Sequence, residues 1–269
     1  MRIVRTVAEL GEALAPARER GDRIGLVPTM GAYHQGHLSL MRAARAASEL
    51  VIVSLFVNPT QFGPGEDLDR YPRDEGGDAR AAEREGVDVL FIPSVDEMYA
   101  PGFDTTVDPG ALATILEGAV RPGHFRGVAT VCVRLFGLTM PDLAFFGRKD
   151  AQQLAVLRQV VRDLALPIEL RGCPTVRDSD GLALSSRNAY LSPDVRARAL
   201  ALPRALEAGL AAHRSGSDAV EAARATLDAA DVEVDYVAVA DLDGPTLAAA
   251  IRVDGTRLID NVELPGSSA

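Results

Sequence analysis

The chain lacks the features that mark secreted, disulfide-rich or membrane proteins. It has 269 residues but only two cysteines, Cys132 and Cys173, which lie far apart and form no C-x-x-C pair. We therefore expect free, buried thiols in a reducing compartment. No run approaches the roughly 18 apolar residues of a membrane-spanning helix, and the N-terminus lacks the apolar core of a signal peptide. These absences predict a cytoplasmic protein with no membrane partner.

Positive charge is also scarce, and lysine is almost absent. The net charge of −10 argues against a broad basic surface for nucleic acid, although it is compatible with a local positive pocket. Of the 28 basic residues 27 are arginine, and Lys149 is the only lysine. A position that keeps lysine in such a chain is a candidate for a role that needs its compact ammonium group. Survival of this lysine by chance is the alternative.

The first two thirds of the chain alternate strand-like apolar runs with helical periodicity. We expect strands at 24–27, Leu50–Val57, Val87–Ile92, Asp142–Phe146 and Pro167–Leu170, and helices from His37 onward and over Asp74–Glu85 and Ala151–Leu164. Strands this continuously apolar are typical of a parallel sheet that is covered on both faces. The pattern predicts an α/β fold with a Rossmann-like, doubly wound parallel sheet in a domain spanning residues 1–175.

After about Cys173 the sequence changes character. Two helices are predicted at Pro193–His213 and Ser217–Ala229, and then a strand at Glu233–Val239 with Thr256–Val262 as its partner. This predicts a second, smaller α+β domain over residues 176–269. The turn-rich segment before it suggests a hinge, so we expect this domain to act as a lid that closes over a bound ligand.

Two of the four histidines, His34 and His37, lie three residues apart where the first buried strand becomes a helix. In an open α/β sheet, ligands bind beyond the carboxyl ends of the strands. A helix N-terminus at that edge offers backbone N–H groups and a positive dipole end to a phosphate. The alternative is a surface turn with two incidental histidines.

The next strand is followed by two amides, Asn58 and Gln61, which fall at the same edge of the predicted sheet. Amides can donate and accept hydrogen bonds without charge, so they suit a small polar substrate. Since Asn-Pro also begins many turns, a purely structural role is equally compatible with Asn58-Pro59.

A third strand runs into Gly147 and then a helix, with Lys149 at the junction. A cation is disfavoured beside the positive end of a helix dipole, unless an anion binds there. Asp150 beside it is a natural N-cap. Two further segments are polar and contain glycine: Asp180–Asn188, where Ser185, Ser186 and Arg187 could hold a polyphosphate, and the basic run Arg121–Gly127. An ordinary serine-rich loop and a solvated basic loop are the alternatives.

Taken in order, these segments resemble the H-x-G-H nucleotidyltransferase superfamily, and within it the pantothenate synthetase (pantoate–β-alanine ligase) family. The segments that carry the resemblance are Pro28–Gly31 with His34–His37, Val57–Phe62, Arg121–Gly127, Phe145–Gln153, Ser185–Asn188 and Arg257–Asn261. They extend from residue 28 to residue 261. An isolated H-x-G-H would be a weak signal, whereas this ordered series is specific.

The resemblance implies an enzyme that joins pantoate and β-alanine with ATP as a substrate. Pantoate is first converted to pantoyl adenylate with release of pyrophosphate, and β-alanine then displaces AMP to give pantothenate. Mg²⁺ is implied as the companion of ATP, held chiefly by the phosphates. The resemblance also implies a homodimer.

The resemblance further implies roles for individual residues. Phosphate contacts and catalysis are expected of His34, His37, Lys149, Ser185, Ser186 and Arg187. The ATP site would also include Met30, Gly36, Gly147, Asp150, Val176 and Leu184, and pantoate or β-alanine would contact Met30, Asn58, Gln61, Tyr71, Arg121 and Gln153.

The chain departs from the family pattern at three positions. Arg148 replaces a usual glutamate beside the lysine, and we expect its side chain to point to solvent. Where some relatives have an acidic pair linked to magnesium, this chain has Gly77-Asp78, so only Asp78 could serve as a metal ligand. Leu184 stands where others have methionine, which is a small apolar exchange.

Three other functions compete with this interpretation. A different H-x-G-H adenylyltransferase would need more positive charge near its acceptor site than the amides at 58, 61 and 153 supply. A non-catalytic nucleotide sensor would tolerate loss of Lys149 or His37, yet both are present. An interaction module would leave the clustering of polar residues unexplained.

Overall fold

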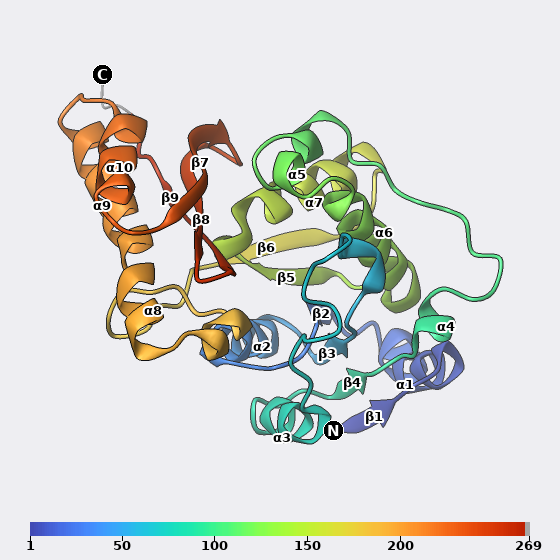
Figure 1. The fold of residues 1–269 in the computed structure, drawn as a ribbon. Coiled ribbons are helices and arrows are strands. Elements are labelled where there is room, and N and C mark those ends of the chain that lie inside the picture. Colours follow the sequence, from blue (N-terminus) through green and yellow to red (C-terminus); the bar gives the residue numbers. More distant parts are fainter. Residues whose placement is uncertain (267–269) are drawn as a thin grey trace. The chain divides into compact units, whose positions relative to one another are not determined.

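The computed structural model describes residues 1–266 and divides into two compact units (Figure 1). Unit 1 comprises Met1–Gly147 and Val156–Cys173. Unit 2 comprises Arg148–Ala155 and the chain from Pro174 onward. A short segment that carries Lys149 thus groups with the C-terminal part of the chain rather than with the strand that precedes it.

Unit 1 is built on a six-stranded, entirely parallel sheet, which confirms the predicted α/β class. The strands are β1 (Arg2–Val4), β2 (Ile24–Thr29), β3 (Leu50–Leu55), β4 (Val89–Phe91), β5 (Leu143–Gly147) and β6 (Glu169–Cys173), in the order β1-β4-β3-β2-β5-β6. Because β2 has β3 on one side and β5 on the other, the order reverses at β2. The carboxyl ends of these central strands are therefore the expected place for a ligand.

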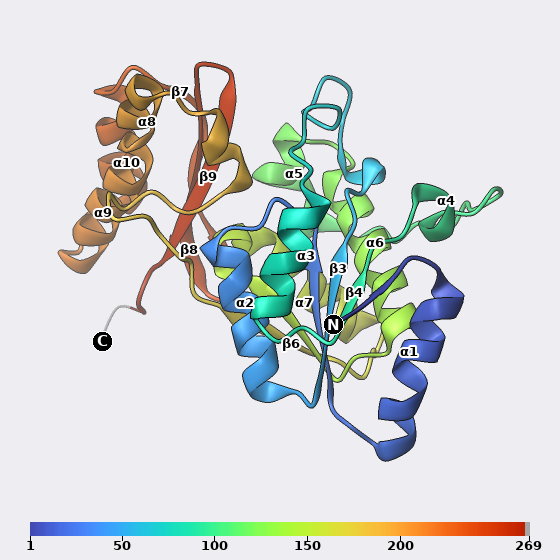
Figure 2. The ribbon, with the colours of Figure 1, turned by 90° about the horizontal axis from the view of Figure 1, so that it is seen from below.

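Helices cover both faces of this sheet (Figures 1 and 2). They are α1 (Val7–Arg20), α2 (Gln35–Ala47), α3 (Glu75–Arg84), α4 (Val95–Met98), α5 (Glu117–Val120), α6 (His124–Thr139) and α7 (Ala151–Asp163). Figure 2 shows α2 and α3 on one face and α1 with α6 on the other. The buried residues of β2 and β3, such as Val27 and Val53, form a core with Met41 of α2. The short helical turns η1 (Pro59–Gln61), η2 (Ala111–Thr114) and η3 (Arg148–Asp150) lie in the connections.

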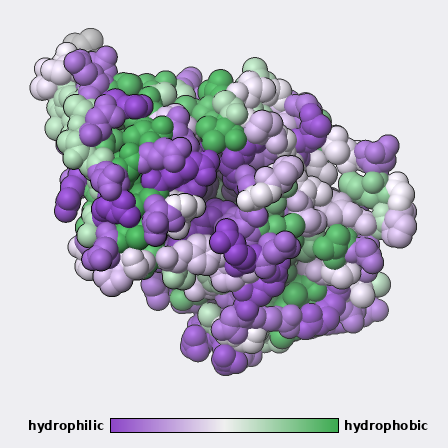
Figure 3. Space-filling view, viewed as in Figure 1, coloured by the Kyte–Doolittle hydropathy of each residue, from purple (hydrophilic) through white to green (hydrophobic). Residues whose placement is uncertain are grey.

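Unit 2 contains a three-stranded antiparallel sheet of β7 (Glu233–Asp241), β8 (Pro245–Val253) and β9 (Thr256–Glu263), packed against helices. The helices are α8 (Pro193–Ala199), α9 (Ala201–Arg214) and α10 (Ala219–Asp228), with the turn η4 (Ser186–Tyr190) before them. Leu202, Leu227 and Leu247 are among the buried residues of its core. On the face seen in Figure 3, hydrophobic residues are visible among hydrophilic ones over α9 and α10.

Two sequence predictions for this unit were wrong. The single helix expected at Pro193–His213 is two helices, broken at Leu200. Pro203 explains the break, since its ring would clash with the carbonyl of residue 199 in a continuous helix. Thr256–Val262 is not the partner of Glu233–Val239, because β8 lies between them and pairs with both. β8 was missed since its apolar run shows no alternation.

Cys132 forms no disulfide and is buried, and this burial raises the pKa of its thiol to about 12. Cys173 forms no disulfide either and is only half-buried. Across residues 1–266, no helix is long and apolar enough to span a membrane.

Candidate active site

His34 and His37 close the N-terminus of α2 by capping each other's backbone. The Nδ1 atom of His34 accepts from the backbone N–H of Gly36 at 3.1 Å, and the Nδ1 atom of His37 accepts from the backbone N–H of His34 at 3.3 Å. This is a capping box made of two imidazoles in place of the usual hydroxyl and carboxylate. The rings lie 4.2 Å apart between centroids.

The capping bonds also define the chemistry of the two rings. An imidazole nitrogen that accepts a hydrogen bond carries no hydrogen, so in each neutral ring the hydrogen is on Nε2. Both histidines therefore present an N–H donor on the side of the ring away from the helix backbone. Two such donors at a helix N-terminus can stabilise phosphate charge.

Asp78 of α3 holds the turn that leads into this cap. Its carboxylate oxygens accept from the backbone N–H groups of Ala32 and Tyr33, each at 2.7 Å, and its side chain is buried. Burial raises the pKa of this carboxyl, and the two backbone hydrogen bonds oppose that shift. Both oxygens accept from the backbone, so Asp78 supports this turn, and its role as a magnesium ligand stays a prediction. Within residues 1–266 no group of three or more His, Cys, Asp or Glu side chains is arranged to hold a metal ion.

Gln61, at the end of η1, is held by its neighbour Asn58. The Nδ2 atom of Asn58 donates to Gln61 Oε1 at 3.1 Å and to the carbonyl of Gly127 at 3.2 Å, and its Oδ1 accepts from Thr60 and from the Tyr99 hydroxyl. The side chain is buried and its hydrogen-bonding capacity is filled. The structure therefore gives Asn58 a positioning role in place of the predicted contact with substrate. Gln61 Nε2 lies 3.3 Å from the Met30 sulfur, so two predicted substrate residues do meet.

A second network holds the backbone of Gln61. Arg121 makes a two-pronged ion pair with Glu66, at 2.7 and 2.6 Å, and its third nitrogen lies 3.1 Å from His124 Nε2. His124 Nδ1 lies 2.9 Å from the carbonyl oxygen of Gln61. Because a carbonyl only accepts, the hydrogen of His124 is on Nδ1 and its Nε2 accepts from Arg121. Arg121, predicted to flank the substrate, is thus used to support Gln61 through His124.

The ionisation states in this network follow from burial and charge. Burial lowers the pKa of His124 to about 4, and the positive charge of Arg121 acts in the same direction. The ring is therefore neutral at pH 7, as its acceptor role requires. Burial alone would raise the pKa of Glu66, but its hydrogen bonds and ion pair with Arg121 outweigh this, so that the pKa is lowered.

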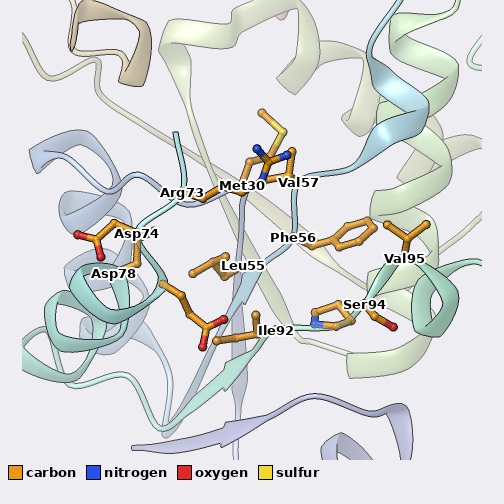
Figure 4. Close-up of a pocket in the computed structure, with 12 residues that line it drawn as sticks. Met30, Leu55, Phe56, Val57, Arg73, Asp74, Asp78, Ile92, Ser94 and Val95 are labelled. Atoms are coloured by element: carbon orange, nitrogen blue, oxygen red, sulfur yellow. The ribbon is translucent and has the colours of Figure 1, made fainter. Parts of the chain in front are cut away.

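A cavity of about 300 Å³ lies at the carboxyl ends of β3 and β4 in unit 1 (Figure 4). Its lining is apolar along the strand ends and charged at α3, where Arg73, Asp74 and Glu75 contribute. Arg73 lines the cavity together with Met30 and Val57 (Figure 4). Of the predicted site residues only Met30 and Asp78 line it, so the cavity adjoins the Met30 end of the candidate site. Tyr71 is buried against Phe62 and does not line the cavity.

In unit 2 the structure groups most of the remaining predicted residues. Lys149 lies in η3 with its ammonium 3.6 Å from Asp150 Oδ1, and Gln153 follows in the first turn of α7. The backbone N–H of Leu184 donates to the carbonyl of Val176 at 2.9 Å, so these two predicted ATP contacts are direct neighbours. Ser185 caps η4 through a 3.3 Å bond from the backbone N–H of Arg187.

We expected the side chain of Arg148 to point to solvent, but it is only partly exposed. It forms an ion pair with Glu263 of β9, and 43% of its side chain is exposed. The charge reversal at this position is therefore balanced by an acidic residue that sequence reasoning did not connect to it.

The fold and the capped histidine pair together define a class: a Rossmann-like nucleotidyltransferase with an H-x-G-H motif at the carboxyl end of a central strand. The family model for pantoate–β-alanine ligase matches residues 2–263. The chain belongs to this family.

Individual relatives agree with this assignment. The chain is 49% identical to the pantothenate synthetase of Moorella thermoacetica, covering 98% of this chain and 99% of the relative, and 53% identical to that of Roseiflexus castenholzii, covering 96% and 98%. Its structure is similar to the crystal structure of pantothenate synthetase from Thermus thermophilus, with a TM-score of 0.92, 48% identity, and 98% and 99% of the two chains covered. It is also similar to a pantoate–β-alanine ligase from Francisella tularensis solved with βγ-ATP and β-alanine, with a TM-score of 0.86, 33% identity, and 98% and 97% covered.

Proposed function

We propose that the protein condenses pantoate with β-alanine to give pantothenate, with ATP converted to AMP and pyrophosphate. The observation that carries this proposal is the family match across residues 2–263. In the first step the carboxylate of pantoate attacks the α-phosphate of ATP and displaces pyrophosphate. In the second step the amine of β-alanine attacks the acyl carbon of pantoyl adenylate and displaces AMP. Neither step needs a covalent nucleophile from the protein, so catalysis rests on positioning and charge stabilisation.

Unit 1 supplies most of the contacts for pantoate and part of those for phosphate. The Nε2–H groups of His34 and His37 donate to phosphate oxygens, and Gly36 allows the backbone to approach the nucleotide. Gln61 binds pantoate beside Met30, with Tyr71 near the same substrate. Asn58 and the Glu66–Arg121–His124 network act through Gln61. This proposal is supported by the way both networks converge on that one residue.

Unit 2 supplies the remaining contacts for ATP. Lys149 stabilises the charge that develops on the phosphates, and Ser185, Ser186 and Arg187 hold the phosphate chain. Asp150 binds the ribose hydroxyls, and Val176 and Leu184 lie along the adenosine together with Gly147 of unit 1. Gln153, which also belongs to unit 2, holds pantoate. We further propose that the C-terminal part of the chain acts as the predicted lid, which excludes water from the acyl adenylate.

Three finer proposals accompany this function. Mg²⁺ accompanies ATP and is held by its phosphates; since Asp78 is engaged by the backbone, no protein ligand and no step of the reaction is assigned to the metal. The enzyme is a homodimer, and it works in the cytoplasm. Sedimentation at low micromolar concentration tests the dimer directly, since a monomer has a mass of 28.5 kDa.

The decisive experiment is isotope exchange between labelled pyrophosphate and ATP. We expect exchange that requires pantoate and proceeds without β-alanine. The first step is reversible, and the second step cannot take place when β-alanine is absent. Replacing pantoate with a hydroxy acid of different shape controls for non-specific exchange. If folded protein shows no pantoate-dependent exchange, the adenylate route is wrong for this chain.

A further inference from the structure

Two neighbouring residues of β9, Asp260 and Asn261, each hold a different segment of unit 2 with their side chains. They belong to the run Arg257–Asn261, which contributes to the family resemblance but has no role in the reaction described above. The segments that they hold are the ones that carry the proposed ATP contacts, so the inference rests on the proposed function.

Asn261 fixes the turn that carries Lys149. Its Nδ2 atom donates to the carbonyl oxygen of Arg148 at 3.0 Å and to that of Lys149 at 2.8 Å. Both hydrogens of one amide nitrogen are thus used on successive carbonyls of η3. Since these two carbonyls set the course of the backbone on either side of the Lys149 Cα atom, they also set the direction in which its side chain leaves.

Asp260 fixes a second segment, the Val176–Leu184 loop, through Arg177. Its two oxygens accept from the two terminal nitrogens of Arg177 at 2.6 and 3.0 Å, and only 1% of its side chain is exposed. The same guanidinium also donates to the carbonyl of Gly181 at 3.1 Å. Arg177 is bridged to Ala183, directly beside the Val176–Leu184 hydrogen bond. The ion pair therefore ties the start and the tip of this loop to β9.

We propose that Asp260 and Asn261 form one positioning device, which holds the Lys149 turn and the Val176–Leu184 loop in a fixed mutual arrangement for ATP. The two residues are themselves connected, because the backbone N–H of Asn261 donates to Asp260 Oδ1 at 2.8 Å. Because β9 is paired along its length, Asp260 and Asn261 keep a fixed distance from each other. The two segments that they hold therefore move little relative to one another. Sites for phosphoryl chemistry depend on such support for the residues that touch the ligand.

The test compares Asp260→Asn and Asn261→Ala with a matched control, Asp235→Asn. Asp235 lies in the same sheet, is 9% exposed, and accepts from Arg252 and Arg257 at 2.9 and 2.5 Å. The control therefore loses a comparable ion pair that holds neither proposed ATP segment. Arg177→Lys is a milder fourth variant, because it keeps the charge but not the two-pronged geometry. Binding of a non-hydrolysable ATP analogue and of pantoate is measured by calorimetry, alongside the melting temperature and pyrophosphate exchange.

We expect the Asp260 and Asn261 variants to bind the ATP analogue at least about tenfold more weakly and to lose exchange by up to the roughly 100-fold that a 1 Å misplacement can cost. Pantoate affinity should fall less than the affinity for the analogue, because Met30 and Gln61 of unit 1 also contact pantoate in the proposed function. Asp235→Asn should lower the melting temperature similarly but keep the affinity for the analogue. If Asp260→Asn does not fold, Asn261→Ala and Arg177→Lys decide the question.

Unchanged affinity for the analogue in those variants, or a loss equal to that of Asp235→Asn, would overturn the proposal. Exchange by the wild-type protein is measured first, because it tests the proposed function separately from the positioning device. Exchange that is absent there counts against the proposed function, whereas normal wild-type exchange with unaffected variants counts only against the positioning device.

Discussion

At the residue scale, the rings of His34 and His37 have both a structural role and a chemical role. Their Nδ1 atoms cap α2, and this leaves the Nε2–H groups as donors. The sequence could predict that the two histidines lie at a strand-to-helix junction, because the apolar pattern and Gly31 indicate it. It could not predict the reciprocal capping, which depends on ring rotamers that no local pattern encodes.

Other residue roles depend on partners that local sequence does not reveal. Asn58 was expected to touch substrate, but its partners Tyr99 and Gly127 are distant in sequence and fill its hydrogen-bonding capacity. Glu66 was not considered at all, since its importance comes from Arg121, 55 residues further along the chain. Residue type and local spacing predict where a polar side chain lies, whereas long-range partners decide whether it is available to a ligand.

Lys149 gives the sharpest test at this scale. We expect Lys149→Ala to lower turnover by roughly 10²- to 10³-fold, the effect of removing one preorganised electrostatic donor, with little change in melting temperature. Lys149→Arg should recover only part of the activity, because a planar guanidinium does not reproduce a compact ammonium. Arg162→Ala is a suitable control, since it removes a 73% exposed positive charge from the other end of α7. Near-normal turnover of Lys149→Ala would show that the single lysine survived by chance.

His124 makes a prediction about pH. Its pKa falls from an ordinary 6.5 to about 4 on folding, chiefly because of burial. As the pH drops from about 6.5 to 4, the unfolded chain takes up a proton at this position and the folded protein does not, so wild type loses stability over this window. His124→Asn lacks this proton uptake. The difference in free energy of unfolding between wild type and variant should therefore narrow by up to roughly 3 kcal/mol as the pH falls. Urea titrations at several pH values measure it, and a constant difference would contradict the buried neutral ring.

At the element scale, the contact between α6 and η1 depends on Gly127. A Cβ atom at this position would lie 2.7 Å from the Gln61 Cα atom and closer still to the carbonyl of Thr60. We expect Gly127→Ala to displace η1, to cost about 1–3 kcal/mol in stability, and to weaken pantoate binding roughly tenfold.

Gly137→Ala is the matched control for this prediction. It lies in the same helix with open space around its Cβ position, so alanine should be neutral or slightly stabilising there. Both variants are compared by pantoate calorimetry and thermal melting. Pantoate affinity that is equal in the two variants would argue against a role for the α6–η1 contact in binding.

The elements themselves were more predictable than their contacts. Strands β2 to β6 and helices α2, α3 and α7 follow from apolar periodicity and are confirmed within a few residues. β1 and α1 carried no prediction, since β1 is three residues long and α1 contains Pro16. Pro16 weakens the helical signal of α1, and a strand without alternation such as β8 falls outside the pattern from which strands are predicted.

At the scale of the whole molecule, each unit has a hydrophobic core of its own. One core joins β2, β3 and α2 in unit 1, and the other joins α9, α10 and β8 in unit 2. The second core depends on a close approach at Gly209 of α9. A Cβ atom there would lie 2.7 Å from the carbonyl oxygen of Ala219 and would also collide with Leu247. Because these neighbours include backbone, relaxation around an added methyl group is limited.

We therefore expect Gly209→Ala to destabilise unit 2 by about 1–3 kcal/mol and to leave the unit 1 core unchanged. Amide hydrogen exchange should rise in α9, α10 and β8 while β2, β3 and α2 keep the protection of wild type, because the two cores share no residues. Gly11→Ala in α1 is the control, since nothing lies near its Cβ position. A uniform loss of protection across both units would mean that the chain unfolds as one cooperative body. Selective loss in unit 2 should also weaken binding of the ATP analogue before that of pantoate, because the proposed contacts with ATP in unit 2 depend on β9.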